Sequence, residues 1–243
     1  MADLPRVVLP PMLGGQADSW TALVELAPTF GLNWLLVGGQ MVFLHDVERG
    51  ATDVRPTDDV DVVVDLRAEP EGLGRIHLAL ASAGFVQDSP SPEGTAHRYR
   101  RNGATIDVLA PDNIGTRARL TLGSGRTIQA PGTSQAFHRS ELVVVEFGGV
   151  KAEIHRPNLV GGLVGKAAAV VKISSQSAAS RAKHLRDFDS LARLLGVVDR
   201  QSADLTKGER RMLRSLSNAP ELSELAVASL RLMVDAETAR PSD

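Results

Sequence analysis

The sequence lacks cysteine altogether, which excludes disulfides, zinc–thiolate sites and thiol nucleophiles. Aromatic residues make up only 4% of the chain, so leucine, valine and alanine must fill most of the core. A charge excess is also missing, because the formal net charge is -2. No overall basic field therefore indicates nucleic acid or an anionic membrane, although a local basic patch can exist within a nearly neutral total.

Long hydrophobic runs are absent as well. No segment approaches the roughly 18 apolar residues that a membrane span requires. The first ten residues lack a charged segment followed by an apolar stretch of signal-peptide length. We therefore expect a cytoplasmic protein that does not bind membranes. The 243 residues, of which 43% are hydrophobic, are enough for one globular unit with two lobes.

Hydrophobic patterning predicts an α+β fold. Residues 1–157 are expected to form a lobe with a mixed or antiparallel sheet flanked by helices, and residues 158–243 a helical lobe. In the first lobe we expect an irregular arm over residues 1–16 and helices over 18–30, 41–48 and 71–83, with Asp18 or Ser19 as the cap of the first helix. We also expect strands over 34–37 and 60–64, and hairpins over 97–109, 117–130 and 141–155. In the second we expect helices at 159–173 and 181–196, a polar connection at 174–180 and two weaker helices up to residue 236.

Two acids stand out within the strand predicted near residue 60. Asp59 and Asp61 alternate with Val60 and Val62, so both carboxylates point to one face while the valines face the core. Carboxylates held that close repel each other, and each gains a proton unless a cation lies between them. Oxygen ligands at such positions suit Mg²⁺ or Mn²⁺. The alternative is an exposed edge strand whose polar face is merely acidic.

A glycine turn precedes the acids. Leu36-Val-Gly-Gly39 ends an apolar strand and leads into a predicted helix, where backbone N–H groups can bind phosphate. A Gly-Gly pair alone is a weak signal. A glycine turn, a helix and then an Asp-x-Asp strand form a much rarer order.

That order resembles the polymerase-β-like nucleotidyltransferase superfamily, including its Arg-x-Thr-x-Asp-x-Asp variant through Arg55-Pro-Thr57. Two departures are Gln40, at a position often held by serine, and the long spacing between Gly39 and Asp59. The resemblance implies an enzyme that transfers an NMP from an NTP and requires Mg²⁺ or Mn²⁺. It implies metal ligation by Asp59, Asp61 and Asp107, and nucleotide binding by Gly38, Gly39, Gln40, Thr57 and Lys166.

The third acid of that set is Asp107. It stands in mid-strand between Ile106 and Val108, where a solvated aspartate is uncommon. By resemblance it would help to bind a second metal ion and activate the acceptor hydroxyl. The alternative is an acid on the exposed face of a strand. Asp112, in a Pro-Asp-Asn turn, is expected to be structural.

The helical lobe carries a second group of charged residues. On a helical wheel, Lys166 and Asp187 lie at the edges of apolar stripes, and Lys183 precedes Asp187 by one turn. They could simply extend to solvent or form an ion pair. With the first lobe, they resemble the AbiEii-like branch, the nucleotidyltransferase toxins of bacterial toxin–antitoxin pairs. His184 departs from that motif where an acid is expected. The resemblance implies that Lys166 neutralises phosphate charge and that Asp187 either orients Lys166 or acts on the acceptor.

The resemblance also implies partners. The acceptor would be a tRNA 3′ end, and a cognate antitoxin would be a protein partner. A basic approach surface could be formed by Arg98, Arg100, Arg101, Arg117 and Arg119, unless these are a solvated strand face. Arg55 is expected to pair with the acidic strand rather than to act as a ligand. The alternatives are a nucleotidyltransferase that modifies a small molecule such as an antibiotic, one that modifies a protein, and a degenerate fold that only binds a nucleotide.

Overall fold

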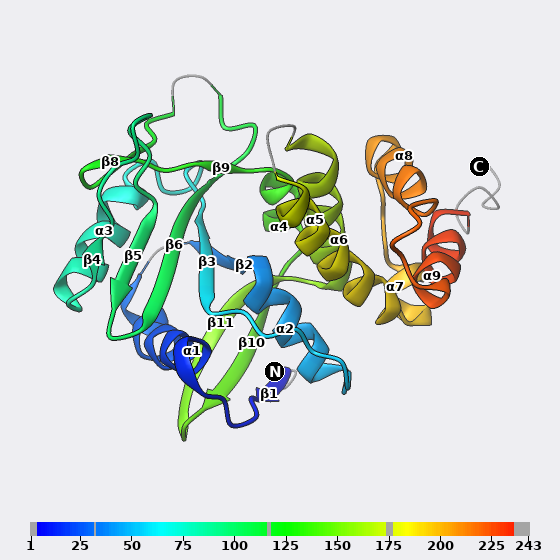
Figure 1. Ribbon diagram of the computed structural model, residues 1–243, viewed down its shortest axis with the longest axis horizontal. Helices are drawn as coiled ribbons and strands as arrows, with labels where there is room; N and C mark the ends of the chain where they lie inside the picture. Colours follow the sequence, from blue (N-terminus) through cyan, green and yellow to red (C-terminus); the bar gives the residue numbers. More distant parts are fainter. Residues whose placement is uncertain (1–3, 32, 116–117, 174–176, 236–243) are drawn as a thin grey trace.

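The computed structural model describes residues 4–31, 33–115, 118–173 and 177–235. Figure 1 shows a lobe of strands and helices, with the helices α5 to α9 forming the other side of the molecule. The chain has an α+β fold with mixed sheets, and its C-terminal region is mostly helical, as the patterning predicted. No helix in these ranges is both long enough and apolar enough to cross a membrane.

The larger sheet has six strands in the order β2-β3-β6-β5-β4, with β9 also paired to β6. Their bounds are β2 Trp34–Val37, β3 Asp59–Val64, β4 Val86–Gln87, β5 Arg98–Arg101, β6 Ala104–Pro111 and β9 Gln129–Ala130. β3 runs antiparallel to β2 and parallel to β6, while β5 and β6 form an antiparallel hairpin. The predicted Asn-Gly turn is confirmed, since Asn102 (φ 48°) and Gly103 (φ 87°) both adopt the left-handed conformation of a tight hairpin.

A second sheet contains three strands, β1 (Arg6–Val8), β10 (Ser140–Phe147) and β11 (Val150–Pro157). The predicted β10–β11 hairpin is confirmed. The expectation of an irregular arm over residues 1–16 is wrong in part, because β1 pairs in parallel with β10, a contact distant in sequence. Of the hairpin predicted over 117–130, the structure has the short strands β7 (Thr121–Leu122) and β8 (Gly125–Arg126); Arg117 lies outside the described residues.

Helix α1 (Gly14–Leu26), followed by the 3₁₀ turn η1 (Ala27–Thr29), begins earlier than predicted. Ser19, expected near its cap, lies inside the helix and is buried. Its hydroxyl donates to the Asp58 carbonyl (2.5 Å) and accepts from the Thr105 N–H (3.0 Å). A serine that joins two strands in this way is not available to cap a helix, which accounts for the error.

The other helices of the first lobe are α2 (Gly38–Glu48), α3 (Gly72–Ser82) and α4 (Thr133–His138). α3 was predicted. α2 begins at the glycines themselves rather than at Met41, and the six-residue α4 was not predicted. Between α2 and the second sheet, the fully buried Arg156 bridges Glu48 and Glu141, so its charge is neutralised inside the fold.

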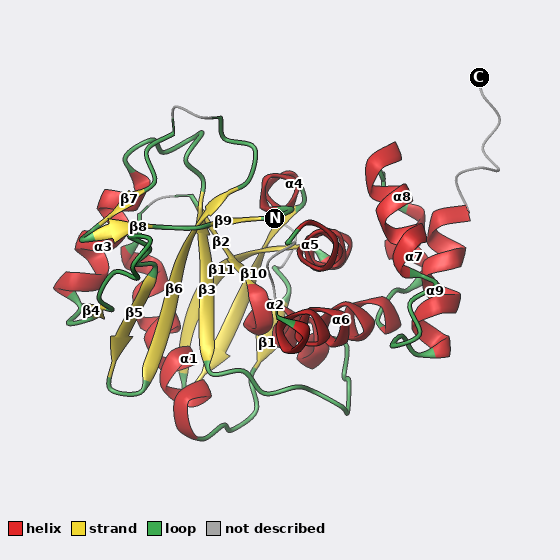
Figure 2. Cartoon of the chain, turned by 45° about the horizontal axis from the view of Figure 1, so that its top comes forward, coloured by secondary structure: helices red, strands yellow, loops and turns green. Residues whose placement is uncertain are grey.

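The helical region contains α5 (Leu159–Lys172), α6 (Ala178–Arg193), α7 (Val197–Gln201), α8 (Lys207–Leu216) and α9 (Glu224–Asp235). Asn158 caps α5 by accepting a hydrogen bond from the Gly161 N–H (2.9 Å). After α6, three helices replace the two that were predicted, because Gly196 and Thr206 each begin a new one. Figure 2 shows α5 and α6 beside the strands, with α7 to α9 farther out. Residues 174–176 of the predicted polar connection lie outside the described ranges.

Candidate active site

The three predicted acids meet on two neighbouring strands. The parallel register of β3 and β6 pairs Asp61 with Asp107, and Asp59 lies one pleat along the same face as Asp61. Val60 and Val62 are fully buried on the other face, as predicted. Because β3 has partners on both sides, the edge-strand alternative is wrong. Asp107 is only 4% exposed, so it is not an acid on an exposed face either.

The beginning of α2 lies directly against these acids. Gly38 has φ +70°, a conformation that favours glycine, and a Cβ added there would lie 1.7 Å from the Asp61 Oδ2. A Cβ on Gly39 would lie 2.8 Å from the Thr57 Oγ1. Both glycines therefore permit contact between the backbone and the acidic segment. This contact places the first turn of a helix next to the Asp61 carboxylate.

Gln40 and Thr57 hold this arrangement from within. The Gln40 amide is fully buried; it accepts a hydrogen bond from the Trp20 indole (2.6 Å) and donates one to the Thr57 carbonyl (2.5 Å). The Thr57 hydroxyl donates to the Asp59 Oδ1 (2.7 Å). The polar groups of both side chains thus have partners within the protein, and their contact with a nucleotide stays a prediction.

The pKa values of Asp59 and Asp61 are shifted in opposite directions. Burial raises the pKa of Asp61 to about 7, and the neighbouring Asp59 and Asp107 add to the rise. Burial also opposes ionisation of Asp59, but the hydrogen bond from Thr57 and the charge of Lys183 hold its pKa below the ordinary value. The Lys183 Nζ lies 4.0 Å from the Asp59 Oδ1. Near neutral pH, Asp61 is therefore partly protonated, because the nearby cations do not fully compensate a negative charge there.

Asp107 already has a cationic partner. The Arg98 Nε and Nη2 donate to its two carboxylate oxygens at 2.8 and 2.6 Å, and the same Nη2 lies 3.7 Å from the Asp59 Oδ2. These hydrogen bonds raise the pKa of Arg98. Arg98 therefore competes with any other cation for the oxygens of Asp107. The hairpin register opposes Arg101 to Ala104 and therefore Arg98 to Asp107, so the sequence held a signal for this pair that the prediction missed.

Two other arginines of the predicted basic surface also have acidic partners. Arg100 pairs with Asp88 at 3.1 Å. Arg101 pairs with Glu25 at 3.2 Å, and its guanidinium covers the Phe85 ring at 4.7 Å. Arg119 is exposed, and Arg117 lies outside the described residues. Arg98, Arg100 and Arg101 thus each pair with an acid, and a basic approach surface on the 98–101 strand stays a prediction.

On the helical side, Asp187 joins two cations. The Lys166 Nζ lies 2.7 Å from the Asp187 Oδ2, and the Arg55 Nε donates to the Asp187 Oδ1 at 2.9 Å. Burial disfavours a charged Asp187, but Lys166 and Arg55 outweigh it and lower the pKa. Arg55 was expected to hold the acidic strand, which is wrong, since its carboxylate partner is Asp187. Asp187, only 2% exposed, is in position to orient Lys166.

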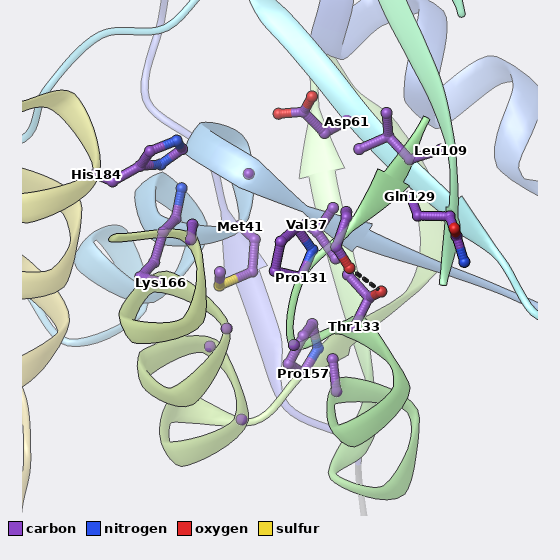
Figure 3. Close-up of a pocket in the computed structure, with 18 of the residues that line it drawn as sticks. Val37, Met41, Asp61, Leu109, Gln129, Pro131, Thr133, Pro157, Lys166 and His184 are labelled. Atoms are coloured by element: carbon purple, nitrogen blue, oxygen red, sulfur yellow. Dashed lines mark hydrogen bonds between the residues drawn. The ribbon is translucent and has the colours of Figure 1, made fainter. Parts of the chain in front are cut away.

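A cavity of about 240 Å³ extends from the acids between α4 and α5. Figure 3 shows Asp61, Lys166 and His184 around one end, with Thr133, Pro131 and Pro157 farther along. The remaining walls are mostly apolar or glycine, among them Met41, Ile128, Gly161, Gly162, Gly165, Ala169 and Ile173. The cavity is thus polar where it meets the acids and apolar beyond them.

His184 was noted only as a departure from a motif, and the structure places it in this cavity wall. Its buried Nδ1 has no hydrogen-bond partner among the described residues. Burial, with the charge of Lys166, lowers its pKa to about 4, so the ring is neutral at physiological pH. A neutral imidazole can donate or accept a hydrogen bond beside the cavity.

The donor set fits a hard divalent cation. Asp59 and Asp61 offer carboxylate oxygens from one face of a strand. The raised pKa of Asp61 reflects burial and then repulsion by Asp59 and Asp107, and a bound cation would offset both. The fit is less direct at Asp107, where Arg98 occupies both oxygens. No protein-family model matches this chain, and a search of curated proteins found no match either.

Proposed function

We propose that this protein is a metal-dependent nucleotidyltransferase that transfers an NMP from an NTP to an acceptor hydroxyl. The observation that carries the proposal is the meeting of three acids on the paired strands β3 and β6, with the backbone of Gly38 against Asp61. Carboxylates in this number, beside the first turn of a helix, suit the joint binding of a divalent cation and a phosphate chain.

In this proposal Asp59 and Asp61 hold Mg²⁺ or Mn²⁺, which when bound neutralises charge on the triphosphate. The backbone at Gly38 and Gly39 approaches the phosphates, which their lack of a side chain allows. Arg98 is drawn from Asp107 towards the anionic substrate. Asp107 then accepts the proton of the acceptor hydroxyl, whose oxygen bonds to the α-phosphorus as the bond to pyrophosphate breaks.

Lys166 supplies the second positive charge. Its ammonium group lies at the polar end of the cavity and is fixed by Asp187, which Arg55 holds on its other oxygen. A cation that is fixed before the substrate arrives stabilises developing phosphate charge without rearrangement. Asp187 and Arg55 are positioning residues in this scheme. The cavity beyond Lys166 offers apolar walls for the rest of the nucleotide.

The proposed acceptor is the 3′ end of a tRNA, and the proposed role is that of a toxin with a cognate antitoxin. What supports this choice is the likeness of the Lys166 and Asp187 segments to the AbiEii-like toxins. A small-molecule or protein acceptor would use the same acids. The acceptor therefore has to be identified by where the label goes.

The deciding experiment incubates the purified protein with each α-³²P-labelled NTP and Mg²⁺, with either total tRNA or a protein extract. The Asp61→Asn variant tests the acids, and Asp58→Asn, at the exposed neighbour, is the matched control. We expect label on tRNA, lost in Asp61→Asn and kept in Asp58→Asn. Label on protein instead would show that the acceptor is a protein. No label on either, together with no Mg²⁺-dependent NTP binding, would refute the proposal that the protein is an enzyme.

A further inference from the structure

A shallow hollow of about 530 Å³ lies on the surface of α8, away from the acids. The described residues along it are four cationic side chains and two uncharged polar ones, Lys207, Arg210, Arg211, Arg214, Ser215 and Asn218. Spacings of three and four residues put the four cations on one face of the helix. In a chain with a net charge of -2, this is a local concentration of positive charge.

Within the described ranges, nearby acids do little to cancel the charge of Lys207, Arg211 and Arg214. Glu209 is the acid within α8, and it is buried, where it caps the helix and binds Arg139 at 2.9 Å. Arg214 pairs with Asp235 at 3.2 Å, but both side chains are more than half exposed, so water and salt screen the pair. Lys207 and Arg211 are exposed. The hollow therefore keeps a positive field towards solvent.

The hollow and the active-site cavity have a common neighbour. A second cavity of about 570 Å³, between α5 and α8, shares Arg211 and Ser215 with the hollow. The same cavity shares Gly132 with the cavity that ends at Asp61. In Figure 2, α4, α5 and α8 follow one another outward from the strands, in agreement with the packing of α5 against both other helices. Neighbouring cavities therefore lie in sequence from α8 to the cavity that ends at Asp61.

We infer that the α8 hollow binds the phosphodiester backbone of the RNA acceptor, an inference that rests on the proposed function. The cations attract phosphate oxygens, and Ser215 and Asn218 can donate further hydrogen bonds to them. In nucleic-acid complexes, contacts of this kind with phosphates position the protein on the nucleic acid. A protein partner would ordinarily require an apolar centre in the interface, which the lining of this hollow does not provide. In this inference, RNA bound at the hollow extends past the cavity between α5 and α8 towards Asp61.

The test measures binding of a labelled tRNA transcript at several KCl concentrations. The variant Lys207→Glu/Arg211→Glu removes two cations from the hollow. The control Arg126→Glu/Lys151→Glu makes the same charge change at exposed residues of β8 and β11. Circular dichroism and thermal melting establish that both variants fold. We expect the first variant to bind at least about tenfold more weakly, and its plot of log affinity against log salt to be shallower by about 1.5.

The inference is overturned if the two variants bind tRNA equally well, or if the α8 variant loses binding only to polyaspartate, which would indicate an acidic protein partner. Asp61→Asn separates this failure from failure of the proposed function, because it should abolish transfer and leave tRNA binding within about twofold of wild type. If the α8 variant loses tRNA binding but the wild-type protein transfers no NMP, the RNA-binding surface is retained and the proposed enzyme is rejected. If the wild-type protein transfers NMP but the α8 variant binds tRNA as well as wild type, the enzyme is retained and the RNA-binding surface is rejected.

Discussion

Removing the charge of Asp61 should stabilise the metal-free protein at alkaline pH. The folded-state pKa of Asp61 is about 7, against an ordinary value of 3.8. The folded state thus holds this proton more tightly than the unfolded state does. The contribution of Asp61 to the free energy of unfolding is therefore fully present below the pKa of the unfolded state. It is lost as the pH rises through the pKa of the folded state.

The magnitude follows from the two pKa values. Their difference of about three corresponds to about 4 kcal/mol of lost unfolding free energy, accumulated between about pH 4 and pH 7. Asp61→Asn keeps the shape of the side chain and removes the charge next to Asp59 and Asp107. We therefore expect the variant to be more stable than wild type by up to about 4 kcal/mol at pH 8, and by almost nothing at pH 4.

Urea unfolding in EDTA at pH 4, 6 and 8 measures this difference, and Asp58→Asn serves as control for the loss of one exposed acid. Groups that lie far from Asp61 titrate alike in both proteins, so their effects cancel in the comparison. Adding Mg²⁺ at pH 8 should stabilise wild type and leave Asp61→Asn almost unchanged. An advantage of the variant that is the same at all three pH values would refute the account of the acidic cluster.

Three further changes test neighbouring contacts. Gly38→Ala adds a Cβ that collides with the Asp61 carboxylate and should lower NMP transfer by roughly 100-fold, measured as initial rate; a rate within twofold of wild type would contradict the contact. Asp187→Asn leaves Lys166 and Arg55 without a carboxylate and should cost about 3–5 kcal/mol in urea unfolding; a loss below about 1 kcal/mol would mean the pair is not buried in solution. Arg98→Gln frees the third acid and should tighten Mg²⁺ binding by about tenfold in calorimetry, whereas weaker binding would show that the arginine supports the site.

The sequence predicted those parts of the fold that depend on local signals. The apolar run Trp34–Val37, the Asn102-Gly103 turn and the helix α3 all carry their pattern within a few residues. β1 and α4 were missed because each has at most six residues, too few for a periodic pattern. Such elements form through pairing with distant segments, which local patterning does not reveal.

The same distinction applies to the site. The common face of Asp59 and Asp61 follows from the two-residue period of a strand, and the Arg98–Asp107 pair could have been derived from the hairpin register. The hydrogen-bond partners of Gln40 could not have been derived from the sequence, because Trp20 and Thr57 lie 20 and 17 positions away from it. Spacing along a helix or strand predicts which side chains are neighbours within that element, but not which element packs against it.

The contact between Arg55 and Asp187 joins positions 132 residues apart, one before the acidic strand and one in α6. It makes the two halves of the chain mutually dependent in evolution and in engineering. Loss of Asp187 removes the carboxylate partner of Arg55, and loss of Arg55 leaves Asp187 with Lys166 as its cation, so the pair should be inherited together. A chimera that takes residues 1–157 from one protein and the helices from another should work only if both halves carry matching members of this pair.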